Sequence, residues 1–514
     1  MTNFTPRERK YVWWLAGFTF ASRVVLGLRG EVNQASRLLL DDSYYLFSCA
    51  RHLALGHGIT ADGIHPTNGI QPLLVFLEVP FFWIAGNDRW LGVQLSFILF
   101  ALFSSASVVI AARVMSHLRI QNDAAREVAP MQNPVILCAG LWAISFPLFA
   151  LMMNGLETSL YSLLILLAID QYIVIEASAQ RSWMQFARFG GLLGLLILAR
   201  IDALFFLLAI AVFELVRFRA ASIPRIAVLG VTALLVSAPW WIYNYLGFGS
   251  FLPISGQAES IGAVDLGRNL VVALTRFANI SVAAFALPYN QLASYLQILL
   301  SLAILTAVVF VIRRYRLHSG LRKGYRLDAL APFAVAGGIL AIIYVAQFHA
   351  PYFLDRYFQP IRIVWFFIAA VLIAKVSWQP TSKLARYGAL VYMIAATIFF
   401  AIFYSLNFTA PHVSDLYRTA LWAKQHPNVI VGMEQSGVAG FTADNVWNLD
   451  GKMNPDAMRA IKAGTIAAYI NSQKFSYLAD WDSIVQELLV HANAVHQYKL
   501  IDSIDRVQIY QRIE

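Results

Sequence analysis

Long apolar runs, separated by short polar segments, dominate the sequence. Many of them reach the roughly 20 residues that an α-helix needs to cross a bilayer. The pattern predicts a polytopic α-helical membrane protein with about 11 transmembrane helices, its N-terminus inside and its C-terminus outside. The expected spans are 11–28, 91–112, 134–152, 156–177, 189–199, 203–216, 226–246, 291–312, 329–347, 360–376 and 387–406.

One apolar segment, 72–86, does not fit this series. It is short, and Pro72 and Pro80 interrupt it. If it crossed the membrane, every later basic loop would move to the outer side. We therefore expect an interfacial or re-entrant helix on the outer face. The alternative is a true span that is compensated by a missed span elsewhere.

The composition agrees with a membrane protein. The 514 residues are 59% hydrophobic and 13% charged, whereas a soluble protein carries about 25% charged residues. The net charge of +10 could indicate nucleic-acid binding, but the basic residues form short tracts between apolar runs, such as 313–316 and 322–323. This is the positive-inside pattern of cytoplasmic loops. We therefore expect membrane lipids as partners and no nucleic acid.

The polar segments of the chain gather on the outer face in this topology. The cytoplasmic face holds only short basic connectors, so we expect the function to lie outside. The outer segments are 29–90, 154–158, 200–202, 247–290, 349–357 and 407–514.

The end of the chain has a different character. From about residue 411 the apolar runs shorten and charge rises, which predicts a small α/β domain of about 100 residues. We therefore divide the chain into a membrane domain, 1–410, and a C-terminal domain, 411–514. Within the latter, helices are expected at 415–425 and 455–472, and strands at 428–432, 475–479 and 498–510.

Two adjacent acids, Asp41 and Asp42, follow the first span. Carboxylates are costly beside a bilayer, which favours a chemical role. The simpler interpretation is that an acid here caps a helix that starts near Ser43. Capping explains one acid better than two, so we expect one to face a substrate while the other caps the helix.

Cationic side chains follow in the same loop, at Arg51, His52, His57 and His65. Each alone is most simply a solvated loop residue. Together they make the loop cationic beside the acid pair, which suits a phosphate-bearing ligand.

Three charged residues lie at the outer ends of later spans. Glu157 is explained equally well by function or by the dipole at the start of a helix. Arg200 and Asp202 could pair with each other at the junction of two short helices. Charges at membrane depth are rarely without a function, which favours a role in the site.

Arg356 stands on the outer side, against the positive-inside expectation, between Tyr352 and Tyr357. A guanidinium group in such a place is a candidate clamp for phosphate. The alternative is an anchor in the interfacial aromatic belt.

These residues lie in an ordered set of motifs that resembles the GT-C superfamily of integral-membrane glycosyltransferases, which take sugars from polyprenyl-phosphate carriers. The chain is also similar to its bacterial arabinofuranosyltransferases, aminoarabinose transferases and protein O-mannosyltransferases. The motifs are DDSYYLFSCARHLALGHGITADG, PTNGIQPLL, NGLETSL, ARIDALFF, NYLGFGSFLPISG and YFLDRYFQP.

The resemblance implies inverting transfer of a sugar from a polyprenyl-phosphate donor to a glycan, lipid or other hydroxyl acceptor. The reaction would occur on the outer, periplasmic face of a bacterial cytoplasmic membrane, in cell-envelope glycan assembly or modification. The alternatives are a transporter or flippase of lipid-linked sugars and a membrane scaffold. A transporter would favour repeat symmetry and charges at span midpoints, and a scaffold has no need of paired acids.

The resemblance also implies roles for particular residues. Asp41 or Asp42 would be the general base, and we favour Asp41 because Asp42 is nearer the expected helix start. Arg356 would hold the carrier phosphate, and the need for a divalent cation, Mg²⁺ or Mn²⁺, stays open. The expected substrate-binding residues are Arg51, His57, His65, Asn68, Glu157, Arg200, Asp202, Tyr352, Arg356 and Tyr357.

Overall fold

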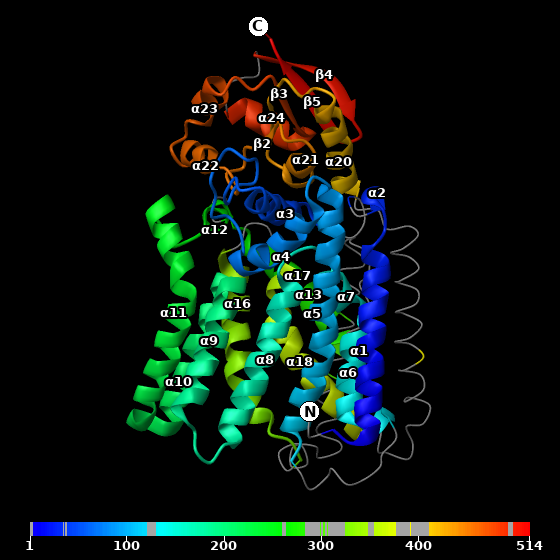
Figure 1. Ribbon diagram of the computed structural model, residues 1–514, viewed down its shortest axis with the longest axis vertical. Coiled ribbons are helices and arrows are strands. Elements are labelled where there is room, and N and C mark those ends of the chain that lie inside the picture. The colour runs from blue at the N-terminus through cyan, green and yellow to red at the C-terminus, as the bar shows by residue number, and fades with distance from the viewer. Residues whose placement is uncertain are drawn as a thin grey trace.

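Figure 1 shows the computed structural model of the protein, a bundle of long helices with a smaller α/β unit at one end. The N-terminus lies near one end of the bundle, and the α/β unit with the C-terminus lies at the other. The structure describes residues 4–33, 35, 39–120, 130–259, 264–282, 299, 302–303, 306, 324–347, 354–376, 391, 411–491 and 497–513.

Most helices of the bundle correspond to expected spans, whereas the helix α13 (Leu266–Val282) lies within 247–290, which was expected to be an outer loop. The spans expected at 291–312 and 387–406 lie almost entirely outside the described residues. The bundle contains α1 (Pro6–Gly27), α5 (Arg89–Leu118), α6 (Pro134–Ile144), α7 (Phe146–Met152), α8 (Thr158–Ala177), α9 (Trp183–Ala199), α10 (Leu204–Phe218), α11 (Ile223–Phe248), α13 (Leu266–Val282), α16 (Ala331–Gln347) and α18 (Gln359–Val376).

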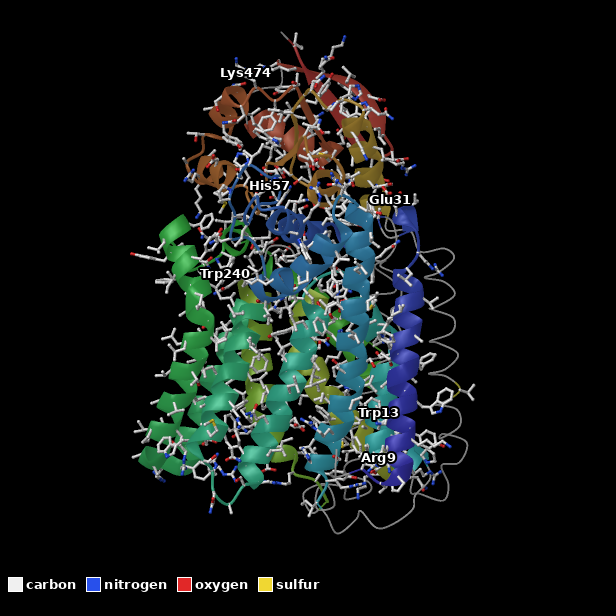
Figure 2. The ribbon with its side chains drawn as sticks, in the orientation of Figure 1. Arg9, Trp13, Glu31, His57, Trp240 and Lys474 are labelled. Atoms are coloured by element: carbon white, nitrogen blue, oxygen red, sulfur yellow. The ribbon has the colours of Figure 1, made fainter. Side chains whose placement is uncertain are left out.

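Three helical stretches in the described part of the chain are long and apolar enough to cross a membrane. They are Arg89–Leu118, Thr158–Ala177 and Leu327–Gln347. Large apolar side chains also point outward from the bundle, such as Trp13 on α1, which is 49% exposed (Figure 2). Such exposure suits a surface in contact with lipid rather than water.

The span expected at 134–152 is divided into α6 and α7. Pro147 has no N–H group, so the helical hydrogen bond to the carbonyl of Ala143 cannot form. The Arg23 guanidinium group instead donates to that carbonyl at 3.5 Å. The expected junction at Arg200 is also present, because α9 ends at Ala199 and α10 begins at Leu204.

The segment expected to be interfacial forms α4 (Pro72–Ala85), which packs against α3 (Asp41–Ala54) and α5. Its 14 residues span about 21 Å at 1.5 Å per residue, less than the roughly 30 Å of a hydrocarbon core. With α3 it lies at the end of the bundle that carries the α/β unit (Figure 1). Short helices, α2 (Glu31–Asn33), α12 (Ile254–Ala258) and α17 (Leu354–Tyr357), complete this end.

Residues 411–513, called the C-terminal segment below, form one mixed sheet with flanking helices. The strand order is β2-β1-β3-β5-β4, with β1 parallel to β2 and β3 and with β5 antiparallel to β3 and β4. Its elements are α20 (Pro411–Lys424), β1 (Val431–Met433), α21 (Gly437–Thr442), β2 (Val446–Asn448), α22 (Pro455–Lys462), α23 (Ile466–Ser472), β3 (Tyr477–Trp481), α24 (Asp482–His491), β4 (Tyr498–Ile504) and β5 (Val507–Arg512).

Two expected elements of this segment are each divided in the structure. The helix expected at 455–472 becomes α22 and α23, because Gly464 adopts a φ of 66° that a helix interior does not tolerate. The strand expected at 498–510 becomes the hairpin β4–β5, which turns at Asp505 with a φ of 54°. The short elements β2 and α21, and the helix α24, were not expected from the sequence.

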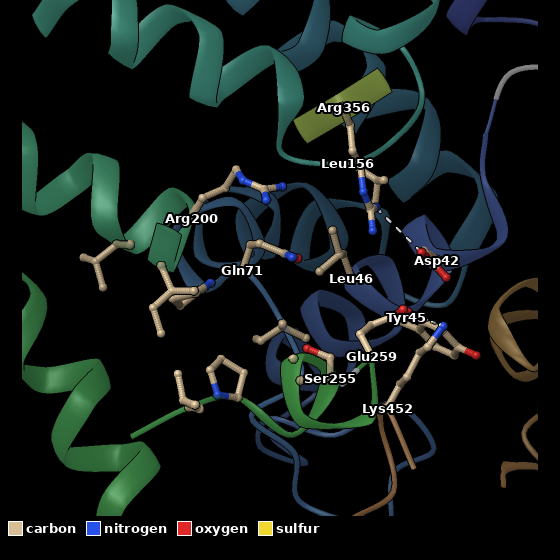
Figure 3. A pocket seen from close by; sticks show the side chains of 18 of the residues that line it. Asp42, Tyr45, Leu46, Gln71, Leu156, Arg200, Ser255, Glu259, Arg356 and Lys452 are labelled. Atoms are coloured by element: carbon tan, nitrogen blue, oxygen red, sulfur yellow. Dashed lines mark ion pairs between the residues drawn. The ribbon is translucent and has the colours of Figure 1, made fainter. Parts of the chain in front are cut away.

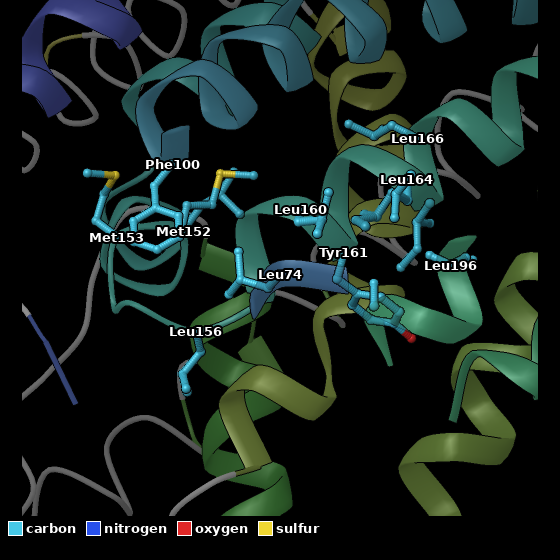
Figure 4. Close-up of a cluster of buried hydrophobic side chains, with 14 of the residues drawn as sticks. Leu74, Phe100, Met152, Met153, Leu156, Leu160, Tyr161, Leu164, Leu166 and Leu196 are labelled. Carbon is cyan, nitrogen blue, oxygen red and sulfur yellow. The ribbon is translucent and has the colours of Figure 1, made fainter. Parts of the chain in front are cut away.

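The hydrophobic core continues from the bundle into the C-terminal segment. Phe441 of α21 lies against Tyr44 and Phe47 of α3, with ring centroids 5.4 and 6.2 Å apart. Deeper in the bundle, buried side chains of α4, α5, α7 and α8 meet in one cluster (Figure 4). The continuous core fixes the C-terminal segment against α3, and so against the acid pair at the start of that helix.

Candidate active site

A cavity of about 390 Å³ lies where the bundle meets the C-terminal segment. One end is polar and is lined by Asp42, Tyr45, Gln71, Arg356 and Lys452 (Figure 3). Apolar side chains from α9, the turn after α9, α11, α16 and the loop before α12 also line the cavity, among them Ile197, Leu198, Ile201, Trp240, Trp241, Leu252, Pro253 and Ile343. The cavity can therefore accept a ligand with a charged head and an apolar tail.

Asp42 and Arg356 face each other across the polar end. Asp42 Oδ2 lies 3.7 Å from Arg356 Nη1, and their side chains are 21% and 12% exposed. Arg356 Nη2 also donates to the Tyr357 hydroxyl at 3.1 Å. A carboxylate and a guanidinium group thus meet in the polar end of the cavity, where the dashed line in Figure 3 marks their ion pair.

Asp41 points elsewhere and does not line this cavity. Its carboxylate accepts hydrogen bonds from the backbone N–H groups of Gly437 at 3.0 Å and Val438 at 2.8 Å. Burial, together with the charge of Asp42, raises the pKa of Asp41 to about 7, although the two backbone hydrogen bonds lower it. We call the contact of Asp41 and Tyr45 with residues 434–448 the docking contact.

The expected capping role of Asp42 is wrong. The helix α3 begins at Asp41, its N-cap residue is Leu40, and no side chain caps it. Both acids therefore lie in the first turn, where successive side chains point about 100° apart. That rotation sends Asp42 to the cavity and Asp41 to α21.

Arg200 lies at the centre of an ion-pair cluster at the end of the bundle that carries the C-terminal segment (Figure 1). Its guanidinium group contacts Glu157 Oε1 at 2.5 Å and Asp202 Oδ2 at 2.6 Å. The Tyr344 hydroxyl donates to the same Asp202 oxygen at 2.5 Å. The expected pairing of Arg200 with Asp202 is present, and Glu157 joins it from α8. Of these charged residues, Arg200 lines the cavity.

Tyr357 connects this cluster with Arg356. Its ring stacks on Tyr344 with centroids 4.0 Å apart. The guanidinium carbons of Arg200 and Arg356 lie 4.7 and 5.0 Å from its centroid. The aromatic ring therefore lies close to both cations and interacts favourably with each.

The other basic candidates of the first loop (residues 29–90) lie away from this cavity. Arg51 Nη1 lies 3.6 Å from Asp444 of the C-terminal segment. His65 Nδ1 lies 2.6 Å from Asp62 Oδ2. His57 is exposed beside the ring of His52 (Figure 2). The structure thus places Arg51 between the first loop and the C-terminal segment rather than at the cavity.

Asn68 supports a cavity wall without lining the cavity. It is fully buried, and its Oδ1 accepts a hydrogen bond from the backbone N–H of Ile254, the first residue of α12, at 3.0 Å. Ser255, Gly256 and Glu259, which follow, line the cavity. Tyr352, the remaining candidate, lies outside the described residues.

Sequence reasoning missed the cavity residues from distant segments. Lys452 and Met453 come from the C-terminal segment, and Glu259 follows α12. Lys452 Nζ lies 2.8 Å from Glu259 Oε1. No motif marks Lys452, since its only local signal is a turn at Gly451 with a φ of 78°.

No group of three or more His, Cys, Asp and Glu side chains that could hold a metal ion occurs in the described part of the chain. The two acids of α3 do not converge on one point, because the Asp41 oxygens accept backbone hydrogen bonds while Asp42 faces Arg356.

Two solved proteins share this architecture over nearly the whole chain. ArnT from Cupriavidus metallidurans, solved with undecaprenyl phosphate, matches 98% of this chain and 97% of its own, with a TM-score of 0.60 and 10% identity. The Archaeoglobus fulgidus oligosaccharyltransferase matches 96% of this chain and 72% of its own, with a TM-score of 0.50 and 12% identity. No protein-family model matches the sequence, and no curated protein matches it significantly.

Both proteins are GT-C glycosyltransferases. The resemblance that the ordered motifs indicated is therefore confirmed at the level of the fold: the chain has a GT-C-like fold. Identities of 10% and 12% are too low to transfer a substrate or an acceptor.

Proposed function

We propose that this protein is an inverting glycosyltransferase that moves a sugar from a polyprenyl-phosphate donor to a hydroxyl group of a glycan, lipid or other acceptor. The observation that carries the proposal is the cavity, which is lined both by charged groups, among them Asp42 and Arg356, and by many apolar side chains. A phosphate head with an isoprenoid tail has the same two parts. Proteins of this fold have been solved with undecaprenyl phosphate and with dolichol-phosphate, which supports the same ligand class.

The reaction takes place at the polar end of the cavity. Asp42 accepts the proton of the acceptor hydroxyl. At the same time the oxygen of that hydroxyl attacks the anomeric carbon of the sugar from the face opposite the phosphate. The bond between that carbon and the phosphate oxygen breaks, and its electron pair leaves with the polyprenyl phosphate. Arg356 stabilises the added negative charge, and Asp42 then releases the proton to solvent.

Asp42 is the base in this proposal, although Asp41 has a pKa raised to about 7, close to what general base catalysis favours. A base must first lie within reach of the proton that it takes. The Asp41 oxygens already accept two backbone hydrogen bonds, and Asp42 lines the cavity. Geometry therefore outweighs the pKa.

Arg356 is the phosphate clamp, and Arg200 supports it. The guanidinium group of Arg200 is engaged by the carboxylates of Glu157 and Asp202, so its charge is largely neutralised. Arg356 lines the cavity beside the proposed base, with its Nη1 atom 3.7 Å from Asp42 Oδ2. We assign Arg200 to holding the cavity wall and Tyr357 in place.

We place the reaction on the outer, periplasmic face of a bacterial cytoplasmic membrane, in cell-envelope glycan assembly or modification. The basic tracts between spans support this orientation. The cavity lies at the end of the bundle opposite the N-terminus (Figure 1), on the side expected to face outward.

The test is a transfer assay with the purified full-length protein in nanodiscs. Synthetic undecaprenyl-phosphate-linked pentoses and hexoses serve as donors, a cell-envelope extract serves as acceptor, and released undecaprenyl phosphate is measured. We expect turnover with at least one donor and a loss of about 10²–10⁴-fold in Asp42→Asn. The matched control is Asp502→Asn, at an exposed acid on β4. Full activity in Asp42→Asn would remove the assignment of the base, and no turnover with any donor would remove the proposed function.

A further inference from the structure

The C-terminal segment reaches into the cavity through one short stretch, residues 448–454. Lys452 and Met453 line the cavity, and they lie about 410 positions after Asp42 in the sequence. In Figure 3 Lys452 approaches the polar end from a different side than Arg356. The stretch therefore brings a second cation to the surroundings of Asp42.

Hydrogen bonds fix this stretch to α3, the helix that carries Asp42. Asn448 Nδ2 donates to the Tyr45 hydroxyl at 3.3 Å, and Tyr45 lies one turn after Asp42. Asn448 Oδ1 accepts from the backbone N–H of Met453 at 3.2 Å, and Asn448 also accepts, through its backbone oxygen, from Asn454 at 3.0 Å. The position of Lys452 is thus set from the same helix as the proposed base.

A close backbone approach fixes the stretch from another side. A Cβ atom placed on Gly69 would lie 2.0 Å from the carbonyl oxygen of Lys452, a distance that non-bonded atoms do not adopt. The absence of a side chain at position 69 is therefore a requirement for Lys452 to lie where it does.

The Lys452 ammonium group lies among carboxylates. It is 2.8 Å from Glu259 Oε1 and 3.8 Å from Asp450 Oδ2. Burial lowers the pKa of Lys452, but the charges of Asp42, Asp450 and Glu259 outweigh it and raise the pKa well above the usual value. Among those favourable contributions Asp42 is the largest. The group is therefore a permanent cation that interacts with the proposed base.

We propose that Lys452 is a positioning residue of the transfer site, whose charge acts on the carboxylate of Asp42 from a different side of the cavity than Arg356 (Figure 3). The inference rests on the proposed function, because it assigns a role in the same reaction. It makes the C-terminal segment part of the reaction chamber. Lys452 and Arg356 balance the carboxylates that surround the base, which are Asp41 on α3, Asp450 on the 448–454 stretch and Glu259 after α12.

The first test compares Lys452→Met with the wild type in the undecaprenyl-phosphate-sugar assay, over pH 5 to 9. We expect kcat to fall about 10-fold or more, with the donor KM changed less than about 3-fold. The acid side of the activity profile should move to higher pH by about 1 unit, because removing a nearby cation makes a carboxylate easier to protonate. Lys452→Arg, which keeps the charge, should restore the profile.

Two variants separate positioning from a purely structural role. Glu259→Gln breaks the 2.8 Å ion pair but keeps the Lys452 cation. The acid limb of its activity–pH profile should therefore lie at lower pH than that of Lys452→Met. The matched control is Lys462→Met, because Lys462 also reaches the α12 region, through Gln257, but does not line the cavity. Its activity should stay within about 2-fold of the wild type.

A backbone variant tests the same placement without changing any charge. Gly69→Ala should displace the 448–454 stretch and lower kcat, whereas Gly30→Ala, which meets no atom within 4 Å, should not.

An unchanged pH profile and rate in Lys452→Met, while Asp42→Asn is inactive, would overturn the role of Lys452 and leave the proposed function standing. Equal profiles in Lys452→Met and Glu259→Gln would reduce Lys452 to a structural contact. Full activity of Asp42→Asn would overturn both proposals.

Discussion

The first turn of α3 borders two different surroundings, the cavity and the docking contact. On the cavity side, Asp42 lies 3.7 Å from the Arg356 guanidinium group, in a space large enough for a ligand. On the docking side, Asp41 is 8% exposed, and two backbone N–H groups of α21 occupy its carboxylate. Two identical side chains that are adjacent in the sequence thus have different surroundings, because the fold places a cavity beside one and α21 beside the other.

The comparison shows that burial and a perturbed pKa do not by themselves identify a catalytic group. Asp41 is the acid with the pKa raised to about 7, yet it does not line the cavity. Asp42 has the space and the cation. Perturbed pKa values also occur in structural contacts, so the access to a cavity separates the two acids better than the pKa does.

The largest expected effect is a difference in kcat between substitutions of two arginines, Arg356 and Arg51, that the sequence proposed as substrate-binding residues. Arg356→Met removes the cation at the leaving phosphate and should lower kcat about 10²–10³-fold, as the loss of a transition-state charge partner typically does. Arg51→Met removes a cation that contacts Asp444, at 3.6 Å, away from the cavity. It should leave kcat within about 3-fold, since ion pairs with an exposed partner contribute little. Equal losses in both variants would contradict the division between cations that line the cavity and cations that lie away from it.

A smaller effect, on stability, is expected at the docking contact. A Cβ atom on Gly437 would lie 2.1 Å from the backbone oxygen of Asp41, so Gly437→Ala must push α21 away from α3. We expect a loss of about 1–3 kcal/mol of unfolding free energy, measured by chemical denaturation in detergent. Faster proteolysis of residues 434–448 should accompany it.

The control is Gly440→Ala in the same helix, where the new Cβ meets its nearest atom at an ordinary 3.5 Å. That variant should be neutral or slightly more stable, since alanine favours a helix. If Gly437→Ala were as stable as the wild type, the close packing of α21 on α3 would be refuted.

The smallest effect is a pH dependence of the docking contact. Burial raises the pKa of Asp41 and of Asp480 to about 7, and that of Glu434 to about 8. The folded state therefore binds protons more tightly than the unfolded state, and stability falls as pH rises from about 4 through 7 to 8. Thermal unfolding at pH 6 and 8.5 should show a lower midpoint at the higher pH. Glu434→Gln, which removes one of the three groups, should reduce the difference, and a higher midpoint at pH 8.5 would contradict the assignment.

Much of the bundle could be predicted from hydrophobic patterning. The described spans lie within a few residues of α1, α5, α8, α11, α16 and α18, because a run of apolar residues is a local signal. The breaks were harder to predict. The division after Ile144 depends on Pro147 and on the Arg23 group that binds the freed carbonyl, and that partner comes from 120 positions away.

The sequence also indicated the chemistry of the candidate site, although only some of the candidates meet. Asp42, Arg200, Arg356 and Tyr357 line one cavity, whereas Arg51 does not. The charge pattern along the chain shows which charged residues lie at a membrane depth where charges are rare. It does not tell whether an unusual charge faces a ligand space or an ion-pair partner from another helix, as Arg200 and Glu157 do.

By itself the sequence determined the helical membrane class and the resemblance to GT-C enzymes, since these follow from composition, periodicity and ordered motifs, and it predicted an outer location for the acid pair. Only the tertiary structure decided which acid faces the cavity, and it added Lys452. The reason is that both outcomes depend on contacts between residues far apart in the chain: Gly437 meets Asp41 across 396 positions. Adjacent carboxylates have the same local signal, and the packing of α21 on α3 alone makes them different.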